Sequence, residues 1–315
     1  CKHCFFRRFP ESHQKGDTPL DELKKEIDEG KKRGCNAVSL CGKGEPMLHR
    51  EVDKIIEYCT SVGMRSSVIT NGDVNIEKYQ RLFDLGLGHV QPSMHGTGKV
   101  LDEISERKEA GKRQWQFLEW LNEKKYPFRI NITIQQANYH SIPDTAMKAL
   151  KLGAFHISLL NFLPHYHWRE HIGEVAVRPV ELVPYLQRTM HQLEGKVLFT
   201  LRYFPMCLLK PKFWKYVTNA RFVLFDPGEW DYGSCSEDED KVWEDAVRIG
   251  EAVAIQGEPC SSCLLREHCG GWNRYYAEAF HLEGLKAIRE IPDEYKDVIG
   301  KRGGLFDLNP ANKER

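Results

Sequence analysis

The sequence lacks any run of about 18 consecutive apolar residues, which is the length that a membrane-spanning helix needs. Its charges cancel, with 45 Lys and Arg against 45 Asp and Glu, so nothing attracts nucleic acid or anionic lipid in general. Fixed-period repeats, low-complexity tracts and coiled-coil heptads are also missing. We therefore expect neither a membrane span nor a nucleic-acid partner. A composition of 41% hydrophobic residues over 315 positions predicts a globular protein instead.

Cysteine is scarce for a disulfide scaffold of this length, because ten cysteines would leave most of the chain unbridged. They gather at the two ends, with two or five residues between neighbours in the closest groups. Such spacing suits several thiolates that converge on one metal centre, as in zinc and iron–sulfur sites. We therefore expect the reducing conditions of the cytoplasm.

Amphipathic helices alternate with short β-branched runs between residues 18 and 200, which predicts a parallel sheet covered by helices. The first helix is expected to have Thr18 as its N-cap and Pro19 at its first position, and to continue until Gly34. The periodicity predicts strands over 37–41, 65–70, 89–93, 129–134 and 156–160, and helices around 51–62, 76–86, 111–124 and 141–152. Residues 197–203 could extend this sheet or begin another unit.

The regular alternation ends near residue 205, where we expect a second unit. A strand is predicted over 222–225 and an amphipathic helix over 241–254, before a cysteine-rich module. We predict a first domain over 1–204, a second over 205–299 and a polar tail over 300–315.

Cys1 and Cys4 form a CxxC pair, which could be half of a zinc site, a redox pair or part of an iron–sulfur motif. A loop that contains Gly42, Gly44, Glu45 and Pro46 follows the first predicted strand. Glycines let a backbone approach a ligand closely, and the glutamate adds an anion beside them. In an α/β barrel, such loops at strand ends are where ligands bind.

These features together resemble the radical S-adenosylmethionine enzymes. Cys1 and Cys4 match the second and third cysteines of the CxxxCxxC signature of that family, and we expect its first cysteine and first strand to lie upstream. Gly44, Glu45 and Pro46 match the end of the family's GGEP-like loop, although a lysine separates Gly44 from Gly42. The resemblance implies an α/β fold, a partial (β/α)6 TIM-like barrel followed by a small cysteine-rich module.

The resemblance also implies a mechanism. Three thiolates would hold a [4Fe–4S] cluster whose open iron chelates S-adenosylmethionine, and a flavodoxin- or ferredoxin-type donor would supply the electron that cleaves it to a 5′-deoxyadenosyl radical. We expect Gly44 and Glu45 to face the methionine ammonium, and Asn131 and Arg129 either to contact ribose and carboxylate or to line the barrel lumen. Further contacts are expected from His3, Gly42, Pro46, Thr70, Asn71 and Ser93. His95 is a candidate proton donor or a strand-end anchor.

A second constellation is the CxxCx5C motif of Cys260, Cys263 and Cys269. It resembles the twitch and SPASM extensions of the same enzymes, and Cys207 is expected as the fourth ligand of one auxiliary [4Fe–4S] cluster. Asn273 stands where the SPASM pattern has a further cysteine, which argues against two auxiliary clusters. Cys235 competes with Cys207 for the fourth position, and a structural zinc site is the alternative for the whole module.

A loop with His165, His167 and Trp168 is expected at the barrel mouth, where it would face substrate rather than bind a metal. We predict an enzyme that abstracts hydrogen from a small molecule or a peptide. The alternative is a non-catalytic interaction protein that carries zinc or an iron–sulfur cluster, although such a protein has no need of the loop with Gly44.

Overall fold

We describe the protein from a computed structural model. It describes residues 1–4, 16–42, 44–73, 75–164, 166–218, 254–267, 269 and 271–299, except for the side chains of 166–168, 218, 254 and 297–299. Within these residues, no helix is both long and apolar enough to span a membrane.

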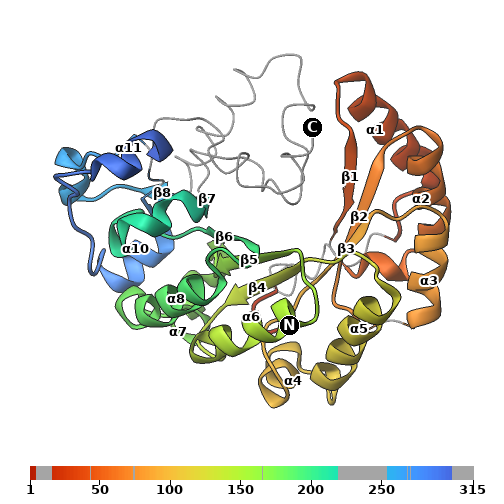
Figure 1. Cartoon of the computed structure of the whole chain (residues 1–315), viewed down its shortest axis with the longest axis horizontal. Coiled ribbons are helices and arrows are strands. Elements are labelled where there is room, and N and C mark those ends of the chain that lie inside the picture. Colours follow the sequence, from red (N-terminus) through yellow and green to blue (C-terminus); the bar gives the residue numbers. More distant parts are fainter. Residues whose placement is uncertain are drawn as a thin grey trace.

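Seven parallel strands form an open arc, the predicted partial barrel (Figure 1). One half holds three strands in chain order and the other holds four, and only two isolated bridges join β3 to β4, Val90 with Phe128 and Ser93 with Asn131. The strands are β1 (Ala37–Leu40), β2 (Arg65–Thr70), β3 (His89–Pro92), β4 (Ile130–Ile134), β5 (His156–Asn161), β6 (Leu198–Arg202) and β7 (Val217–Thr218). Residues 197–203 therefore extend the sheet, and β7 continues it beyond residue 204.

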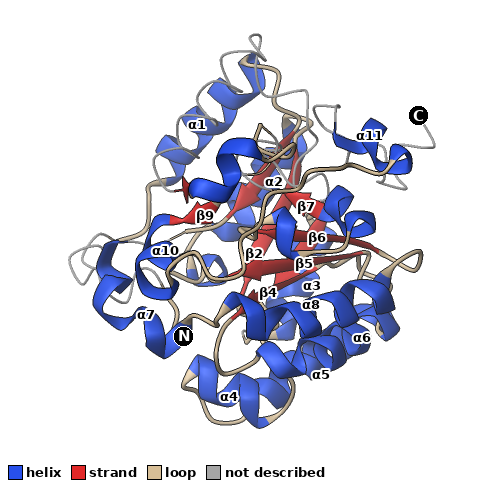
Figure 2. Cartoon of the chain, turned by 90° about the vertical axis from the view of Figure 1, so that its left-hand side faces the viewer, coloured by secondary structure: helices blue, strands red, loops and turns tan. Residues whose placement is uncertain are grey.

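The helices cover the outer face of this arc, which Figure 2 shows from the side. They are α1 (Leu20–Lys32), α2 (Val52–Ser61), α3 (Ile76–Asp84), α4 (Lys99–Ser105), α5 (Ala110–Lys124), α6 (Ile142–Lys151), α7 (Ile172–Val175) and α8 (Pro179–Leu193). The predicted cap of the first helix is wrong, because Pro19 occupies the N-cap position and no side chain caps it. Thr18 instead uses its carbonyl oxygen to accept a hydrogen bond of 3.0 Å from Nε2 of His49.

The two faces of the sheet differ in polarity. In β4, Ile130, Ile132 and Ile134 have no exposed surface and belong to the main hydrophobic core. The alternate positions carry Asn131 and Thr133, because successive side chains of a strand point to opposite faces. The arc is therefore apolar where it meets the helices and polar on its other face.

A small module follows the arc, with antiparallel strands β8 (Ala254–Ile255) and β9 (Trp272–Asn273) and helices α10 (Arg274–Phe280) and α11 (Asp293–Ile299). Tyr276 of α10 donates a hydrogen bond of 3.3 Å to Oδ1 of Asn161, at the end of β5. Two ion pairs also join the module to the barrel, Arg169 with Glu278 and Arg178 with Glu283. The predicted strand 222–225, the helix 241–254 up to its last residue and the tail 300–315 lie outside the described residues.

Candidate functional site

The turn of residues 1–4 is fastened to α4. The backbone N–H of Lys2 donates to the carbonyl oxygen of Ile104 at 2.9 Å, and its ammonium pairs with Glu103 at the same distance. A hydrogen bond of 3.0 Å from the N–H of Cys4 to the carbonyl of Cys1 closes the turn. Both thiols are free, and that of Cys1 is exposed. The turn therefore presents two sulfurs that are available as ligands.

His3 ties the same turn to the ends of β3 and β4. Its Nδ1 lies 2.8 Å from the amide nitrogen of Gln135, and its ring meets the ring of His95 edge to face, with centroids 4.6 Å apart. Burial lowers the pKa of His3 to about 4. His3, which was expected to contact the cofactor, is thus a neutral imidazole whose contacts with Gln135 and His95 fix the main chain of the turn.

His95 is buried, and this burial lowers its pKa well below the usual value. Its Nδ1 accepts a hydrogen bond of 3.1 Å from the N–H of Thr133, so Nδ1 carries no proton. Asn138 has no exposed surface and donates to the carbonyl oxygens of both His95 and Thr133. This geometry favours the strand-end anchor over the proton donor. The predictions missed Gln135 and Asn138, whose only signal is that they are polar and directly follow a buried strand.

Glu45 bridges the loops that follow β1 and β2. One carboxylate oxygen accepts from the hydroxyl of Thr70 at 2.7 Å and the other accepts from the N–H of Asn71 at 2.7 Å. Burial raises the pKa of Glu45, while these hydrogen bonds and the charge of Arg107 act in the opposite direction. The carboxylate therefore braces the loop, and the hydroxyl of Thr70 is further engaged with the phenol of Tyr79.

The loop beside Glu45 leaves room for a ligand. A side-chain carbon placed on Gly42 or Gly44 would meet no atom within 4 Å. Glu45 caps a 3-10 helix over Pro46–Leu48 by accepting from the N–H of Met47, so Pro46 begins a fixed turn. The backbone at the two glycines is accordingly accessible to a ligand, while the hydrogen bonds of Glu45 fix the part of the loop that follows them.

The strand residues that were expected to contact the cofactor lie at two different depths of the sheet. Ser93 and Asn131 pair across the seam between β3 and β4. Arg129 lies two residues earlier, before the first residue of β4, and has no exposed surface. Its charge lowers the pKa of His89, which burial has already depressed, to about 3. Asn131 therefore lies beside the loops, while Arg129 lies deeper in the sheet, as a lumen residue would.

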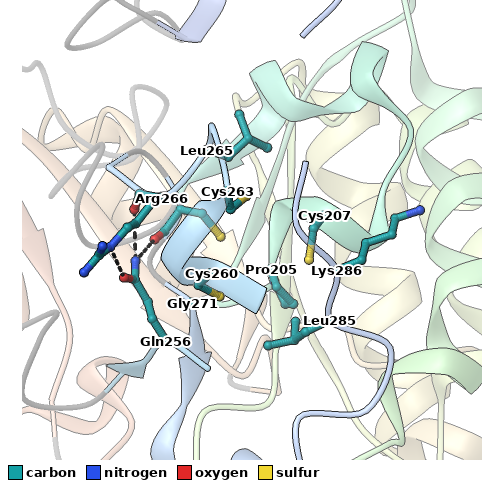
Figure 3. A pocket seen from close by; sticks show the side chains of 11 residues that line it. Pro205, Cys207, Gln256, Cys260, Cys263, Leu265, Arg266, Gly271, Leu285 and Lys286 are labelled. Atoms are coloured by element: carbon teal, nitrogen blue, oxygen red, sulfur yellow. Dashed lines mark hydrogen bonds between the residues drawn. The ribbon is translucent and has the colours of Figure 1, made fainter. Parts of the chain in front are cut away.

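At the other end of the molecule, four cysteines line one cavity with about 340 Å³ of empty space, counted to its open mouth. Cys260, Cys263 and Cys269 come from the module, and Cys207 comes from a short 3-10 helix after β6. Figure 3 shows Cys207 across the cavity from Cys260 and Cys263. Burial raises the pKa of Cys207 and Cys260, and raises that of Cys269 to about 11.

Backbone groups act on all four sulfurs. The N–H of Ile288 donates to Cys263 at 3.3 Å. The backbone of Lys286 and that of Gly257 act to lower the pKa of Cys207 and Cys260, and the backbone of Met206 and of Gly271 acts in the same direction on Cys269. Such donors stabilise negative charge on sulfur and act against burial, although burial has the larger effect and keeps the pKa of Cys207, Cys260 and Cys269 above its usual value.

The described residues contain no group of three or more His, Cys, Asp or Glu side chains placed as ligands of a single metal ion. Zinc bonds to sulfur at about 2.3 Å and would draw four thiolates close together. An iron–sulfur cluster binds each thiolate at a separate iron, which suits a wider arrangement. Cys235 lies outside the described residues, as do His165 and the side chains of His167 and Trp168.

Comparison with known proteins concerns mainly the first half of the chain. Residues 1–149 match the family model of the radical SAM superfamily. The PqqA peptide cyclase of Methylorubrum extorquens (strain PA1) is 28% identical over 175 residues, which are 53% of this chain and 45% of that protein. The AdoMet-dependent heme synthase of Methanosarcina barkeri is 31% identical over 149 residues, which are 46% of this chain and 42% of that protein. The match thus covers about half of this chain and somewhat less than half of each relative.

Solved structures extend the likeness of fold to nearly the whole chain. SuiB of Streptococcus suis bound to S-adenosylmethionine aligns with a TM-score of 0.55 and 16% identity, over 91% of this chain and 71% of that one. The structure of anSMEcpe with bound AdoMet and Cp18Cys peptide aligns with a TM-score of 0.56 and 14% identity, over 100% of this chain and 95% of that one. The cysteine turn and the loop of Glu45 lie at one edge of a partial barrel, within the residues that match the family model, so residues 1–149 have the sequence pattern of the radical SAM superfamily.

Proposed function

We propose that this chain reductively cleaves S-adenosylmethionine and uses the resulting radical to abstract hydrogen from a peptide. The observation that carries the proposal is the match of residues 1–149 to the radical SAM model, which includes both the cysteine turn and the loop of Glu45. When bound, a [4Fe–4S] cluster and S-adenosylmethionine supply the 5′-deoxyadenosyl radical. The protein's own contribution is to bind and orient them.

Within this proposal, Cys1 and Cys4 are two of the three thiolate ligands of the first cluster. The open backbone at Gly42 and Gly44 receives the methionine part of S-adenosylmethionine, and Glu45 holds that backbone in place as well as facing the ammonium. Asn131 and Ser93 lie on the other side of the site and are assigned to the ribose. His3 is fixed by Gln135, which keeps the main chain of the turn in place beside the adenine.

Cys207, Cys260, Cys263 and Cys269 are the proposed ligands of one auxiliary [4Fe–4S] cluster. Their common cavity and the N–H of Ile288 that donates to Cys263 support this set, and a structural zinc site on the same four sulfurs is the alternative. Four protein ligands leave no open iron, so the auxiliary cluster would exchange electrons rather than anchor substrate. A flavodoxin- or ferredoxin-type protein is the proposed electron donor.

The names of the relatives favour a peptide substrate. A PqqA peptide cyclase is among the similar sequences, and SuiB has been solved with its precursor peptide SuiA. The similarity to an AdoMet-dependent heme synthase keeps a small-molecule substrate as the second candidate. The non-catalytic interaction protein loses its support, because the family match covers the part of the chain that holds the cofactor loop.

The test is an anaerobic reconstitution with iron and sulfide, followed by incubation with S-adenosylmethionine and a strong reductant. We expect 5′-deoxyadenosine, measured by liquid chromatography and mass spectrometry. Addition of candidate precursor peptides, and separately of porphyrin precursors, should then show which class loses hydrogen. Absence of 5′-deoxyadenosine from protein with a full complement of iron would refute the proposed reaction.

A further inference from the structure

Gln256 lies directly after β8 and lines the cavity of the four cysteines. Its side-chain nitrogen donates two hydrogen bonds, one of 2.9 Å to the carbonyl oxygen of Arg266 and one of 3.2 Å to the carbonyl oxygen of Cys269. Its side-chain oxygen accepts a bond of 3.3 Å from Nε of Arg266 (Figure 3). A single amide therefore holds the chain at two points of the segment between Cys263 and Cys269.

That segment needs an external tie, because regular structure does not hold it. Residues 264–267 form a turn, and the N–H of Cys269 donates to the carbonyl of Leu265 at 2.7 Å. The side chain of Leu265 is fully buried and fastens the middle of the turn. Gln256 fastens its far end, next to the last of the four sulfurs.

The position of Cys269 matters because its sulfur lies between two parts of the chain. The backbone of Met206, from the segment of Cys207, and that of Gly271, which precedes β9, both act to lower its pKa. Gly271 has a φ of +74°, and a side-chain carbon there would lie 2.4 Å from the carbonyl oxygen of Ile255. The strand pair β8–β9 is thus closely packed two residues after Cys269, and a shift of the sulfur would move it relative to both backbone groups.

We propose that Gln256 is a positioning residue that holds Cys269 as a ligand and thereby preserves the position of its sulfur relative to the backbone of Met206 and Gly271. The proposal rests on the auxiliary cluster of the proposed function. Hydrogen bonds to the sulfurs help to set the reduction potential of an iron–sulfur cluster, so Gln256 acts on that potential without touching iron. Its loss should loosen the cluster and make its potential more negative.

The background protein carries Cys1→Ala and Cys4→Ala, so any cluster that it holds belongs to the second site. The experiment compares this protein with the same protein that also carries Gln256→Met. Methionine keeps the length of the side chain but removes every hydrogen bond. Ser261→Ala is the matched control, because it removes one exposed side-chain bond, to the carbonyl of Glu258, from the 3-10 helix Glu258–Ser262 in the same module, outside the segment that Gln256 holds. The readouts are iron per chain, the rate of iron loss to a chelator, and the midpoint potential followed by electron paramagnetic resonance.

We expect Gln256→Met to lose iron about tenfold faster than its background, since all three hydrogen bonds of the side chain to Arg266 and Cys269 are gone, and to show a more negative potential. Ser261→Ala should match the background in both measurements. If Gln256→Met does not fold, Gln256→Asn keeps the amide on a shorter stem and should lose iron at an intermediate rate.

The outcomes separate the two proposals. A background protein without iron contradicts the auxiliary cluster itself, and the role of Gln256 falls with it. A background protein with about four irons, together with a Gln256 variant that matches it in iron loss and potential, overturns the role of Gln256 alone.

Discussion

The two cysteine sites of this chain are built in different ways. Cys1 and Cys4 lie on a short turn, and Cys1 is exposed. The turn is held by a hydrogen bond to α4 and by the contact of His3 with Gln135. Cys207, Cys260, Cys263 and Cys269 come from two segments far apart in the sequence and line one cavity. The first site is a loop at the edge of the barrel, while the second is lined by protein on several sides. Under the proposed function, the radical chemistry belongs to the first site and electron transfer to the second.

The largest effect is expected from the loss of a cysteine at the first site. In protein that carries the expected upstream cysteine, Cys4→Ala should abolish 5′-deoxyadenosine formation, because the remaining thiolates would hold the first cluster poorly. Iron should fall from about eight to about four per chain, since the second site keeps its own cluster. Iron analysis and mass spectrometry measure both. Undiminished 5′-deoxyadenosine would contradict the assignment of Cys4.

The second largest effect is expected from the loss of a cysteine in the cavity of the four cysteines. Cys207→Ala should remove the auxiliary signal from the spectrum and lower product formation by about tenfold or more, because the cluster loses one of four ligands. Cleavage of S-adenosylmethionine should continue, which separates the two activities. Cys235→Ala is the control and should change neither. A reversed result for these two variants would make Cys235 the fourth ligand.

The third effect sharpens the description of the first site. Glu45→Ala should weaken the binding of S-adenosylmethionine about ten- to a hundredfold, because the loop of Gly44 loses its braces to Thr70 and Asn71 and the ammonium loses its anion. Both clusters should remain assembled. Calorimetric titration of the reconstituted protein gives the dissociation constant, and an unchanged value would place the ligand elsewhere.

The smallest effect concerns the contact that joins the two regions. Tyr276→Phe removes the hydrogen bond to Asn161 but leaves the ring stacked on Trp272, 5.3 Å away between centroids. The free energy of unfolding should fall by about 0.5–1.5 kcal/mol. Urea denaturation measures this change. Tyr275→Phe is the matched control on the same helix, and an equal loss in both variants would argue against a specific contact.

The fold was predictable from the sequence where local periodicity and packing agree. The predicted strand 65–70 is β2, and the predicted strand 156–160 is β5 with one more residue. The seven-residue helix α4 was missed, because it is short and is held by other segments: its Asp102 accepts hydrogen bonds from the N–H groups of Glu109 and Gly111. A short helix that depends on contacts outside itself leaves little pattern in the sequence.

The candidate sites divide in the same way. The turn of Cys1 is one contiguous segment of the sequence, and the loop of Glu45 is another. Residue types and spacing within each segment were therefore enough to find it. The proximity of Cys207 to the other three cysteines was expected only through the family resemblance, since no local spacing connects them. The backbone groups of Lys286 and Ile288 that act on the sulfurs could not have been found, because any residue except proline carries the same groups.

The seam between β3 and β4 has a consequence for motion. Elsewhere in the arc the strands pair through four or five successive residues, apart from the two-residue β7, but among the described residues β3 and β4 pair only through the two isolated bridges. Amide hydrogens across the seam, such as that of Arg129 to the carbonyl of Val90, should therefore exchange with solvent sooner than those in the middle of β5. Glu45 stands on one side of this line and Asn131 on the other. A ligand that spans both would slow that exchange, so the occupancy of the site could be followed by deuterium uptake in the absence of any turnover.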